Sequence, residues 1–295
     1  MQRPSGRMRG AHRERALERA LAESVQARPG EVLVAAVSGG SDSVALAALL
    51  ERAAQAGGAR LVVAHVNHAT RAGSWQDEGV VLAVGSQLGA RVVVAELEPG
   101  PTSEARLRRA RYAALTGLAR AVAGRRLFTA HHAEDQTETV LLALFRGTGP
   151  SGLAGIPPVR RLNRELSVER PLLGIAKADL AEYVAFRRLP AVVDPTNADL
   201  GYRRNAVRAA LVELRHSFSG LDEAVARCAA IAAAERAGIE RARLRRHLRQ
   251  ELGAVLGEHR DVSFEHLDAA ARGIEAGRPG RHFLRPGLAL VVERP

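Results

Sequence analysis

Six consecutive residues, between an apolar run and a helical pattern, have the composition of a loop that binds phosphate. Two adjacent glycines allow a tight turn and bring bare backbone N–H groups against an anion, and the following helix start adds unpaired donors and a positive dipole end. The simpler alternative is a serine-capped helix after a glycine turn. A carboxylate fits beside an anion when it holds a metal ion that itself touches phosphate, so Asp42 is the predicted metal ligand. The loop consists of Ser38, Gly39, Gly40, Ser41, Asp42 and Ser43.

A second group of polar residues follows the apolar run at residues 126–130. His131 and His132 end that run, where the carboxyl edge of a parallel sheet lines ligand sites, and one of them could accept a proton or contact phosphate. Asp135 and Glu138 stand three residues apart on a predicted helix, so they share a face on which two carboxylates can bind an ammonium ion. The alternatives are structural: a strand-end histidine bonded to backbone, and acidic residues that favour a helix N-terminus.

The elements that must position these groups follow a repeating pattern. Apolar β-branched runs alternate with helical patterns over the first two thirds of the chain, which predicts a parallel sheet with helices on both faces. Right-handed crossovers make this a doubly wound, Rossmann-like α/β fold. The glycines and prolines of residues 146–158 predict a loop. The predicted strands are 31–37, 60–67, 91–97 and 126–130, and the predicted helices are 44–56, 75–88, 103–122, 134–145, 176–188 and 202–214.

The character of the chain changes after residue 216. A long Ala/Arg/Glu helical pattern covers residues 221–252, and two short strands are predicted within residues 281–293. We therefore predict an α/β domain at residues 1–216 that holds the phosphate loop, and a smaller, mainly helical domain at 217–295. Five arginines of the long helix face solvent by default, and contact with a polyanion is the alternative. They are Arg241, Arg243, Arg245, Arg246 and Arg249.

The composition favours a globular protein with a polyanionic partner. Hydrophobic residues make up 46% of the chain, and the formal net charge is +11. Lys177 is the only lysine; all other basic side chains of the Lys/Arg type are arginine. Aromatic residues amount to 3%, which argues against a single-strand binder built on stacked aromatic rings.

Cysteine usage and hydropathy exclude several other classes. One cysteine, Cys228, rules out a disulfide framework and a cysteine-based zinc site within the chain, and its Ala-rich surroundings predict a buried structural thiol. No apolar run reaches the roughly 18 residues that a bilayer span needs. The Arg-rich start, residues 1–19, has Glu14 and Glu18 at helical spacing, which indicates an amphipathic helix rather than a transit peptide. We predict a cytoplasmic protein.

The phosphate loop lacks the lysine of the Gly-x-x-x-x-Gly-Lys-Ser/Thr pattern. It resembles the PP-loop of the ATP pyrophosphatases, which cleave ATP between the α- and β-phosphates. Further segments, in order and spacing, resemble the tRNA(Ile)-lysidine synthase family from about residue 31 to 208. These are His-Val-Asn-His at 65–68, Asp-Glu at 77–78, Glu-Ala-Arg at 104–106 with Arg108, Arg111 and Tyr112, His-His-Ala-Glu-Asp-Gln-Thr-Glu-Thr at 131–139, Arg-Gly-Thr-Gly at 146–149, Arg-Pro-Leu-Leu at 170–173, and Asp-Pro-Thr-Asn-Ala-Asp at 194–199 with Tyr202, Arg204, Asn205 and Arg208.

The resemblance implies a two-step ligation. ATP adenylates the 2-oxo oxygen of the wobble cytidine in isoleucine tRNA with a CAU anticodon and releases pyrophosphate; the side-chain amine of free L-lysine then displaces AMP and leaves lysidine. Mg²⁺ accompanies ATP, no membrane takes part, and a homodimer is permitted but not required.

The same resemblance assigns residues. It implies ATP-binding side chains at the phosphate loop, His65, Asn67 and Arg111; lysine-binding carboxylates at Asp135 and Glu138; and catalytic or metal-binding groups at Asp42, His132 and Arg204. Arg111 and Arg204 have the alternative of solvated or structural arginines. The family usually has Asp where Glu134 stands, which leaves the role of that position open.

Three other functions compete with this one. A tRNA sulfurtransferase of the PP-loop class generally relies on paired cysteines, and this chain has one. A small-molecule amidotransferase carries or recruits a glutaminase, for which the sequence shows no nucleophile motif. A basic RNA-binding protein with a degenerate loop is the non-enzymatic alternative, and the intact Asp42 with the Asp135 and Glu138 pair argues against it.

Overall fold

The structure is a computed structural model of the 295-residue chain. It describes residues 6–67, 74–97, 104–192, 203–256, 262–277, 280–285 and 288–292, so His68, the motif at 194–199 and Tyr202 lie outside the described residues. The chain forms two compact units. The first comprises Met1–Leu142 with Ile156–Ala226, and the second comprises Ala143–Gly155 with Arg227–Pro295.

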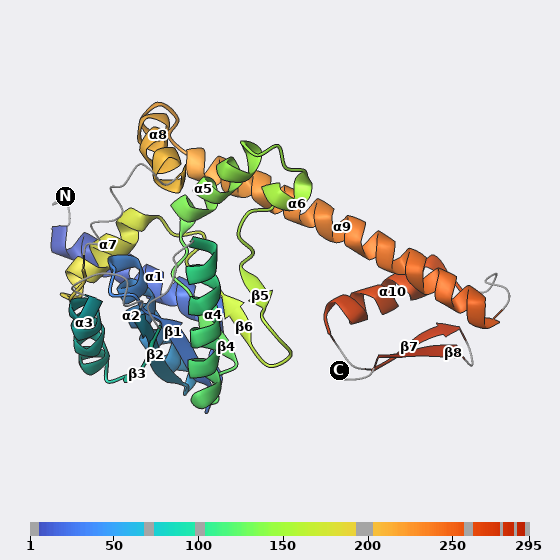
Figure 1. Ribbon diagram of the computed structural model, residues 1–295, viewed down its shortest axis with the longest axis horizontal. Coiled ribbons are helices and arrows are strands. Elements are labelled where there is room, and N and C mark those ends of the chain that lie inside the picture. Colours follow the sequence, from blue (N-terminus) through green and yellow to red (C-terminus); the bar gives the residue numbers. More distant parts are fainter. Residues whose placement is uncertain are drawn as a thin grey trace. The chain divides into compact units, whose positions relative to one another are not determined.

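A six-stranded sheet of order β3-β2-β1-β4-β6-β5 forms the centre of the first unit (Figure 1). Its strands are β1 (Val32–Ala36), β2 (Arg60–Asn67), β3 (Arg91–Glu96), β4 (Arg126–Phe128), β5 (Val159–Arg161) and β6 (Ser167–Glu169). All neighbours pair in parallel except β5 and β6, which are antiparallel. The four predicted strands and their parallel pairing are confirmed. Strands β5 and β6 were not predicted, because three residues each are too few for a periodic signal.

Helices cover both faces of this sheet, as the alternation of side chains along β1 requires. Leu33 and Ala35 pack in one hydrophobic cluster with α1, α2, α3 and α7, whereas Val34 packs in a second cluster with α4. The doubly wound prediction is therefore confirmed. The helices of this unit are α1 (Gly6–Val25), α2 (Ser41–Gly57), α3 (Ser74–Leu88), α4 (Glu104–Ala121), α5 (Ala133–Leu144), α7 (Lys177–Phe186) and α8 (Arg203–Ser217).

Strand β1 and helix α2 form the most deeply buried part of the unit and hold the phosphate loop between them. Leu33, Val34 and Ala35 are fully buried, and an almost unbroken run of α2 from Ser43 to Ala54 is buried as well. Gly57 and Gly58 end α2 for different reasons. A Cβ on Gly57 would lie 2.4 Å from the Ala27 carbonyl oxygen, whereas Gly58 has φ of +68°, a conformation that L side chains rarely adopt. The loop therefore connects two elements that close packing holds rigid.

The second unit is mainly helical, as predicted. It contains α6 (Pro150–Leu153), the part of α9 (Leu221–Leu256) from Arg227 onward, α10 (Phe264–Glu275) and the antiparallel pair of β7 (Gly280–Arg285) and β8 (Leu288–Val292). A small core joins α10 to β7 through Leu267, Ala270 and Leu284. Helix α10 was not predicted, although Ser263 caps it by accepting a hydrogen bond from the His266 N–H. The predicted loop at 146–158 contains the short helix α6.

Cys228 corrects one prediction. Its side chain is exposed on α9, so the prediction of a buried structural thiol is wrong. The buried positions of this Ala-rich stretch are Ala229 and Ala232, and Cys228 points about 100° around the helix from Ala229. None of the described helices is both long enough and apolar enough to cross a membrane.

Candidate functional site

The phosphate loop lies where ligand sites of open α/β sheets are found. Strand β1 pairs with β2 on one side and with β4 on the other, so the strand order reverses between β1 and β4. Ligands bind at the carboxyl ends of strands at such a switch point. The loop follows β1 and the pair His131 and His132 follows β4, so the topology brings the two predicted groups to the same edge.

Hydrogen bonds within the loop, and one from Val192, fix its conformation. Gly39 has φ of +93°, a conformation that favours glycine, and its carbonyl oxygen accepts the Val192 N–H at 2.9 Å. The Ser43 hydroxyl donates to the Gly40 carbonyl oxygen at 2.8 Å and accepts the Ser38 N–H at 3.1 Å. Ser43 is therefore engaged within the loop, and the predicted strand-loop-helix geometry of a phosphate cradle is present.

His132 is surrounded by three carboxylates, one from the start of α2 and two from the first turn of α5. Its Nε2 lies 3.5 Å from Asp42 Oδ2 and 3.4 Å from Asp135 Oδ2, and its Nδ1 lies 2.9 Å from Glu134 Oε2. Burial alone would lower the pKa of His132, but the interactions with Asp42, Glu134 and Asp135 outweigh it and raise the pKa to about 9. An imidazolium cannot accept a proton, so contact with phosphate is the better supported of its two predicted roles.

His131 has the opposite electrostatic environment. Burial lowers its pKa to about 4, and the positive charges of Arg170, Arg108 and Arg204 act in the same direction against the charge of Asp135. Its Nδ1 lies 3.0 Å from the Thr129 hydroxyl. Adjacent histidines thus carry different charges at neutral pH: His132 is a cation, and His131 is a neutral and weak base.

Asp135 and Glu138 share one face of α5, as their spacing predicts, and both are bound by arginines of α8. Arg204 donates from Nε to Glu138 Oε2 and from Nη2 to Asp135 Oδ1, each at 2.7 Å. Arg208, one turn later, donates from Nε to Glu138 Oε1 at 2.7 Å. Glu138 is buried and both its oxygens are occupied. A substrate ammonium must therefore displace or share these guanidinium groups.

Asp42 is ionised and accompanied by two cations. Burial would raise its pKa, but His132 and Lys177 together lower it. Lys177 Nζ lies 3.8 Å from Asp42 Oδ2, and the Lys177 backbone N–H donates to both oxygens of Glu134 at 3.0 Å. No role was predicted for Lys177, and the role of Glu134 was left open. The signal that was available is that Lys177 is the only lysine of the chain.

The other predicted nucleotide-binding residues lie on β2 and α4. His65 is buried at the carboxyl end of β2, where its Nδ1 lies 2.8 Å from the Val37 carbonyl oxygen and its Nε2 has no hydrogen-bond partner. The Asn67 amide donates to Glu78 Oε2 at 3.4 Å. Arg111 is exposed on α4, the helix that covers the opposite face of the sheet from α2. His65 and Asn67 therefore end a strand adjacent to the loop, whereas Arg111 belongs to the other helical layer.

The carboxylates at the loop fit Mg²⁺ brought by a nucleotide. Asp42 Oδ2 and Asp135 Oδ2 both lie within 3.5 Å of His132 Nε2, so two carboxylate oxygens converge there. Mg²⁺ is commonly bound by one or two carboxylates, several waters and substrate phosphates. Within the part of the chain that the structure describes, no group of three His, Cys, Asp or Glu side chains is arranged to hold a metal ion by itself. The donor set therefore suits an ion that shares its ligands with phosphate.

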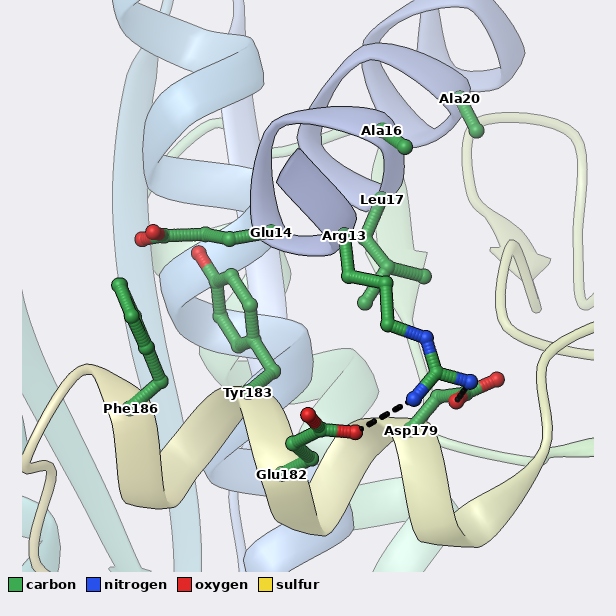
Figure 2. A pocket seen from close by; sticks show the side chains of 9 residues that line it. All are labelled: Arg13, Glu14, Ala16, Leu17, Ala20, Asp179, Glu182, Tyr183 and Phe186. Atoms are coloured by element: carbon green, nitrogen blue, oxygen red, sulfur yellow. Dashed lines mark hydrogen bonds and ion pairs between the residues drawn. The ribbon is translucent and has the colours of Figure 1, made fainter. Parts of the chain in front are cut away.

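A separate cavity of about 290 Å³ lies between α1 and α7 (Figure 2). Its walls are largely apolar, with Leu17, Tyr183 and Phe186 among them, and Arg13 forms ion pairs at its edge with Asp179 at 3.0 Å and with a second carboxylate. None of the predicted site residues lines this cavity. It is distinct from the cluster of charged groups at the phosphate loop.

Comparison with known proteins places these residues in a family context. The sequence model of the PP-loop domain family matches residues 12–215 of this chain. A tRNA(Ile)-lysidine synthase of Gloeobacter violaceus is 39% identical over 196 residues, which cover 66% of this chain and 60% of that protein. One of Geobacter sulfurreducens is 33% identical over 314 residues, which cover 92% of this chain and 65% of that protein. The chain thus spans less than two thirds of each relative.

Among solved structures, the U34-tRNA thiolase NcsA of Methanococcus maripaludis with its [4Fe-4S] cluster is similar in fold. The TM-score is 0.62 at 15% sequence identity, and the match covers 74% of this chain and 77% of that one. At this identity the likeness concerns the fold alone.

Proposed function

The chain belongs to the PP-loop domain family, and we propose that it has the tRNA(Ile)-lysidine synthase activity that names its curated relatives. In the proposed reaction ATP activates the wobble cytidine of isoleucine tRNA with a CAU anticodon, and free L-lysine is then joined to the base. The observation that carries the proposal is the convergence of Asp42, His132 and Asp135 beside the phosphate loop. That arrangement combines an anion cradle, a fixed cation and carboxylates that suit a phosphate-bound metal ion.

The first step is adenylation of the base. The 2-oxo oxygen of cytidine bonds to the α-phosphorus while the bond from that phosphorus to the oxygen bridging to the β-phosphate breaks, and pyrophosphate leaves. A carbonyl oxygen is a weak nucleophile, so the step depends on neutralising charge at the phosphates. The loop N–H groups and the His132 imidazolium supply fixed positive charge. Arg204 adds a third source, because its hydrogen bond to Asp135 holds the guanidinium near His132. Asp42 would hold Mg²⁺, which neutralises phosphate charge when bound.

The second step is attack of the lysine amine on C2 of the activated base. A new C–N bond forms, the C–O bond to AMP breaks, and the proton lost by the amine passes to solvent. Glu138 is buried and neutralised by Arg204 and Arg208, so in this proposal it anchors α8. Asp135 has one oxygen on Arg204 and the other near His132, and it is the carboxylate we assign to the substrate ammonium.

A thiolation reaction is the alternative that the similar fold brings forward, and cysteine usage disfavours it. Iron–sulfur clusters are held by several cysteine thiolates. This chain has one cysteine, Cys228, which is exposed on α9. An amine nucleophile from a free amino acid needs no cysteine.

The partners follow from the reaction: tRNA(Ile) with a CAU anticodon and L-lysine, in the cytoplasm where tRNA is modified. We further propose residues 217–295 as a tRNA-contacting domain. On α9, Arg241 and Arg245 are paired with Glu275 and Asp268. Three other arginines of the same stretch, Arg243, Arg246 and Arg249, are exposed, and we propose them for phosphate contact.

The decisive experiment supplies ATP, labelled lysine and tRNA(Ile) bearing the CAU anticodon. We expect label in the tRNA, loss of label with Asp42→Ala, and unchanged labelling with Arg91→Ala, which removes an exposed charge at the start of β3. Pyrophosphate release without lysine transfer would indicate another PP-loop reaction. If Asp42→Ala leaves RNA binding unchanged and wild-type protein turns over no ATP, the chain is an RNA-binding protein instead.

A further inference from the structure

Lys177 is a charged group at the phosphate loop that the proposed mechanism has not used. It is the only lysine in a sequence whose other Lys/Arg-type side chains are all arginine. Its side chain is 48% exposed, and its Nζ lies 3.8 Å from Asp42 Oδ2. At that distance the ammonium is attracted to Asp42 but is not closely hydrogen-bonded to it, since charged N–H···O bonds measure about 2.7–2.9 Å. Its donors therefore remain available for a ligand at the loop.

The start of α7 holds Lys177 in this place through helix α5. Ala176, the residue before α7, provides no side-chain cap, and the Glu134 carboxylate accepts the Lys177 N–H instead. In the opposite direction, the Ala133 N–H donates to the Ile175 carbonyl oxygen at 3.0 Å. The two helix N-termini are thus tied together by reciprocal bonds. Because Glu134 also binds His132 Nδ1, one carboxylate positions both cations that flank Asp42.

We propose that Lys177 binds the β- and γ-phosphates of ATP, the pyrophosphate that leaves, and that Glu134 is the residue that positions it. This rests on the proposed function in that ATP is cleaved between its α- and β-phosphates. Lysine carries a compact charge on a flexible stem, which suits a phosphate oxygen. Arginine has a planar fork that pairs with a carboxylate through two bonds, and at this position it would close on Asp42. The single lysine of the chain therefore occupies a position at which an arginine would compete with Mg²⁺ for Asp42, the predicted metal ligand.

Equilibrium binding of ATP and of AMP, each with Mg²⁺, tests the contact directly on the full chain. Lys177→Met is expected to weaken ATP binding by about 10-fold or more, the loss typical of one hydrogen bond to a charged group. AMP lacks the β- and γ-phosphates, so its affinity should not change. Arg91→Ala removes a positive charge from the start of β3 and should alter neither affinity. Equal losses for ATP and AMP, or no loss for ATP, would overturn the proposal.

Two further variants test the choice of side chain and the role of Glu134. Lys177→Arg keeps the charge and should recover only part of the ATP affinity; full recovery would show that any cation suffices and would overturn the argument for an ammonium. Glu134→Gln should weaken ATP more than AMP, and the loss should shrink in a Lys177→Met background because Glu134 acts partly through Lys177. Equal losses in both backgrounds would overturn its positioning role.

The outcome is independent of lysine transfer, because neither binding measurement contains tRNA or lysine. Failure of wild-type protein to label tRNA(Ile), with the ATP-specific loss at Lys177→Met intact, would reject the proposed substrates and leave the phosphate contact standing. Labelled tRNA(Ile) from wild-type protein, with no ATP-specific loss in Lys177→Met, would support the proposed substrates and reject the phosphate contact.

Discussion

Replacing Glu138 by glutamine removes one negative charge from the buried junction of α5 and α8. The Glu138 side chain is 1% exposed and receives three hydrogen bonds from Arg204 and Arg208 at 2.7–3.1 Å. Loss of one partner from a buried ion pair costs about 3–5 kcal/mol. The arginine side chains are 32% and 31% exposed, so they regain some hydration, and we expect a loss of about 2–4 kcal/mol. For a unit of this size that lowers Tm by roughly 4–16 °C.

Glu51 offers a matched control in the same unit. It is also buried, on α2, but burial raises the pKa of its carboxyl group, so ionised Glu51 is unfavourable in the folded state. Glu51→Gln should therefore leave Tm unchanged or raise it at pH 7. Thermal unfolding followed by circular dichroism compares the two variants with wild type. Equal Tm for wild type and Glu138→Gln, or the same decrease for both variants, would refute the view that the arginines make Glu138 stabilising.

Three other predictions concern the acid limb of stability, the loop and the arginines of α9. Burial would raise the pKa of Asp222, but hydrogen bonds from Arg215 and Thr137 lower it below 3.8. The ionised carboxylate therefore stabilises the fold fully above pH 3.8, and this contribution is lost as the pH falls through the folded-state pKa. Asp222→Asn should flatten this acid transition when unfolding is measured as a function of pH. Gly39→Ala forces a side chain onto a φ of +93° and should cost about 1–2 kcal/mol in urea unfolding. Alanine at three exposed arginines should reduce the salt dependence of tRNA binding, with the slope of log K against log salt smaller by about 2–3; an unchanged slope would place the contact elsewhere. These are Arg243, Arg246 and Arg249.

The sequence predicted those elements whose conformation depends mainly on neighbouring residues along the chain. The apolar run of β1 and the glycines at 39 and 40 carry their signal within a few residues, and the parallel sheet followed from repeating that signal. Strand β5 reads Val-Arg-Arg and is exposed, so only its pairing with β6 makes it a strand. The error at Cys228 has a similar origin: in an Ala-rich helix every face has the same composition, and tertiary packing decides which one is buried.

The site was predictable as a set of residues but not as a set of charges. Asp42, His132, Asp135 and Glu138 could be chosen because each follows a strand or shares a helix face with another. The charge of His132 could not, because its raised pKa depends on carboxylates that meet only after β1 and β4 pair. The contact of Glu134 with the Lys177 N–H joins residues 43 positions apart, and no spacing rule covers that distance.

The charges around the loop balance before any ligand arrives, and this explains why a phosphate site contains so many carboxylates. Four carboxylates meet four cations there through contacts of 2.7–3.8 Å. Buried ions are tolerated when they are paired, so each carboxylate keeps a cation in place without ligand. Arriving phosphates compete for the cations, and the carboxylates so released gain capacity for Mg²⁺ and for the lysine ammonium. The acidic residues therefore stabilise the fixed cations at the loop while no ligand is bound. They are Asp42, Glu134, Asp135 and Glu138, opposite His132, Lys177, Arg204 and Arg208.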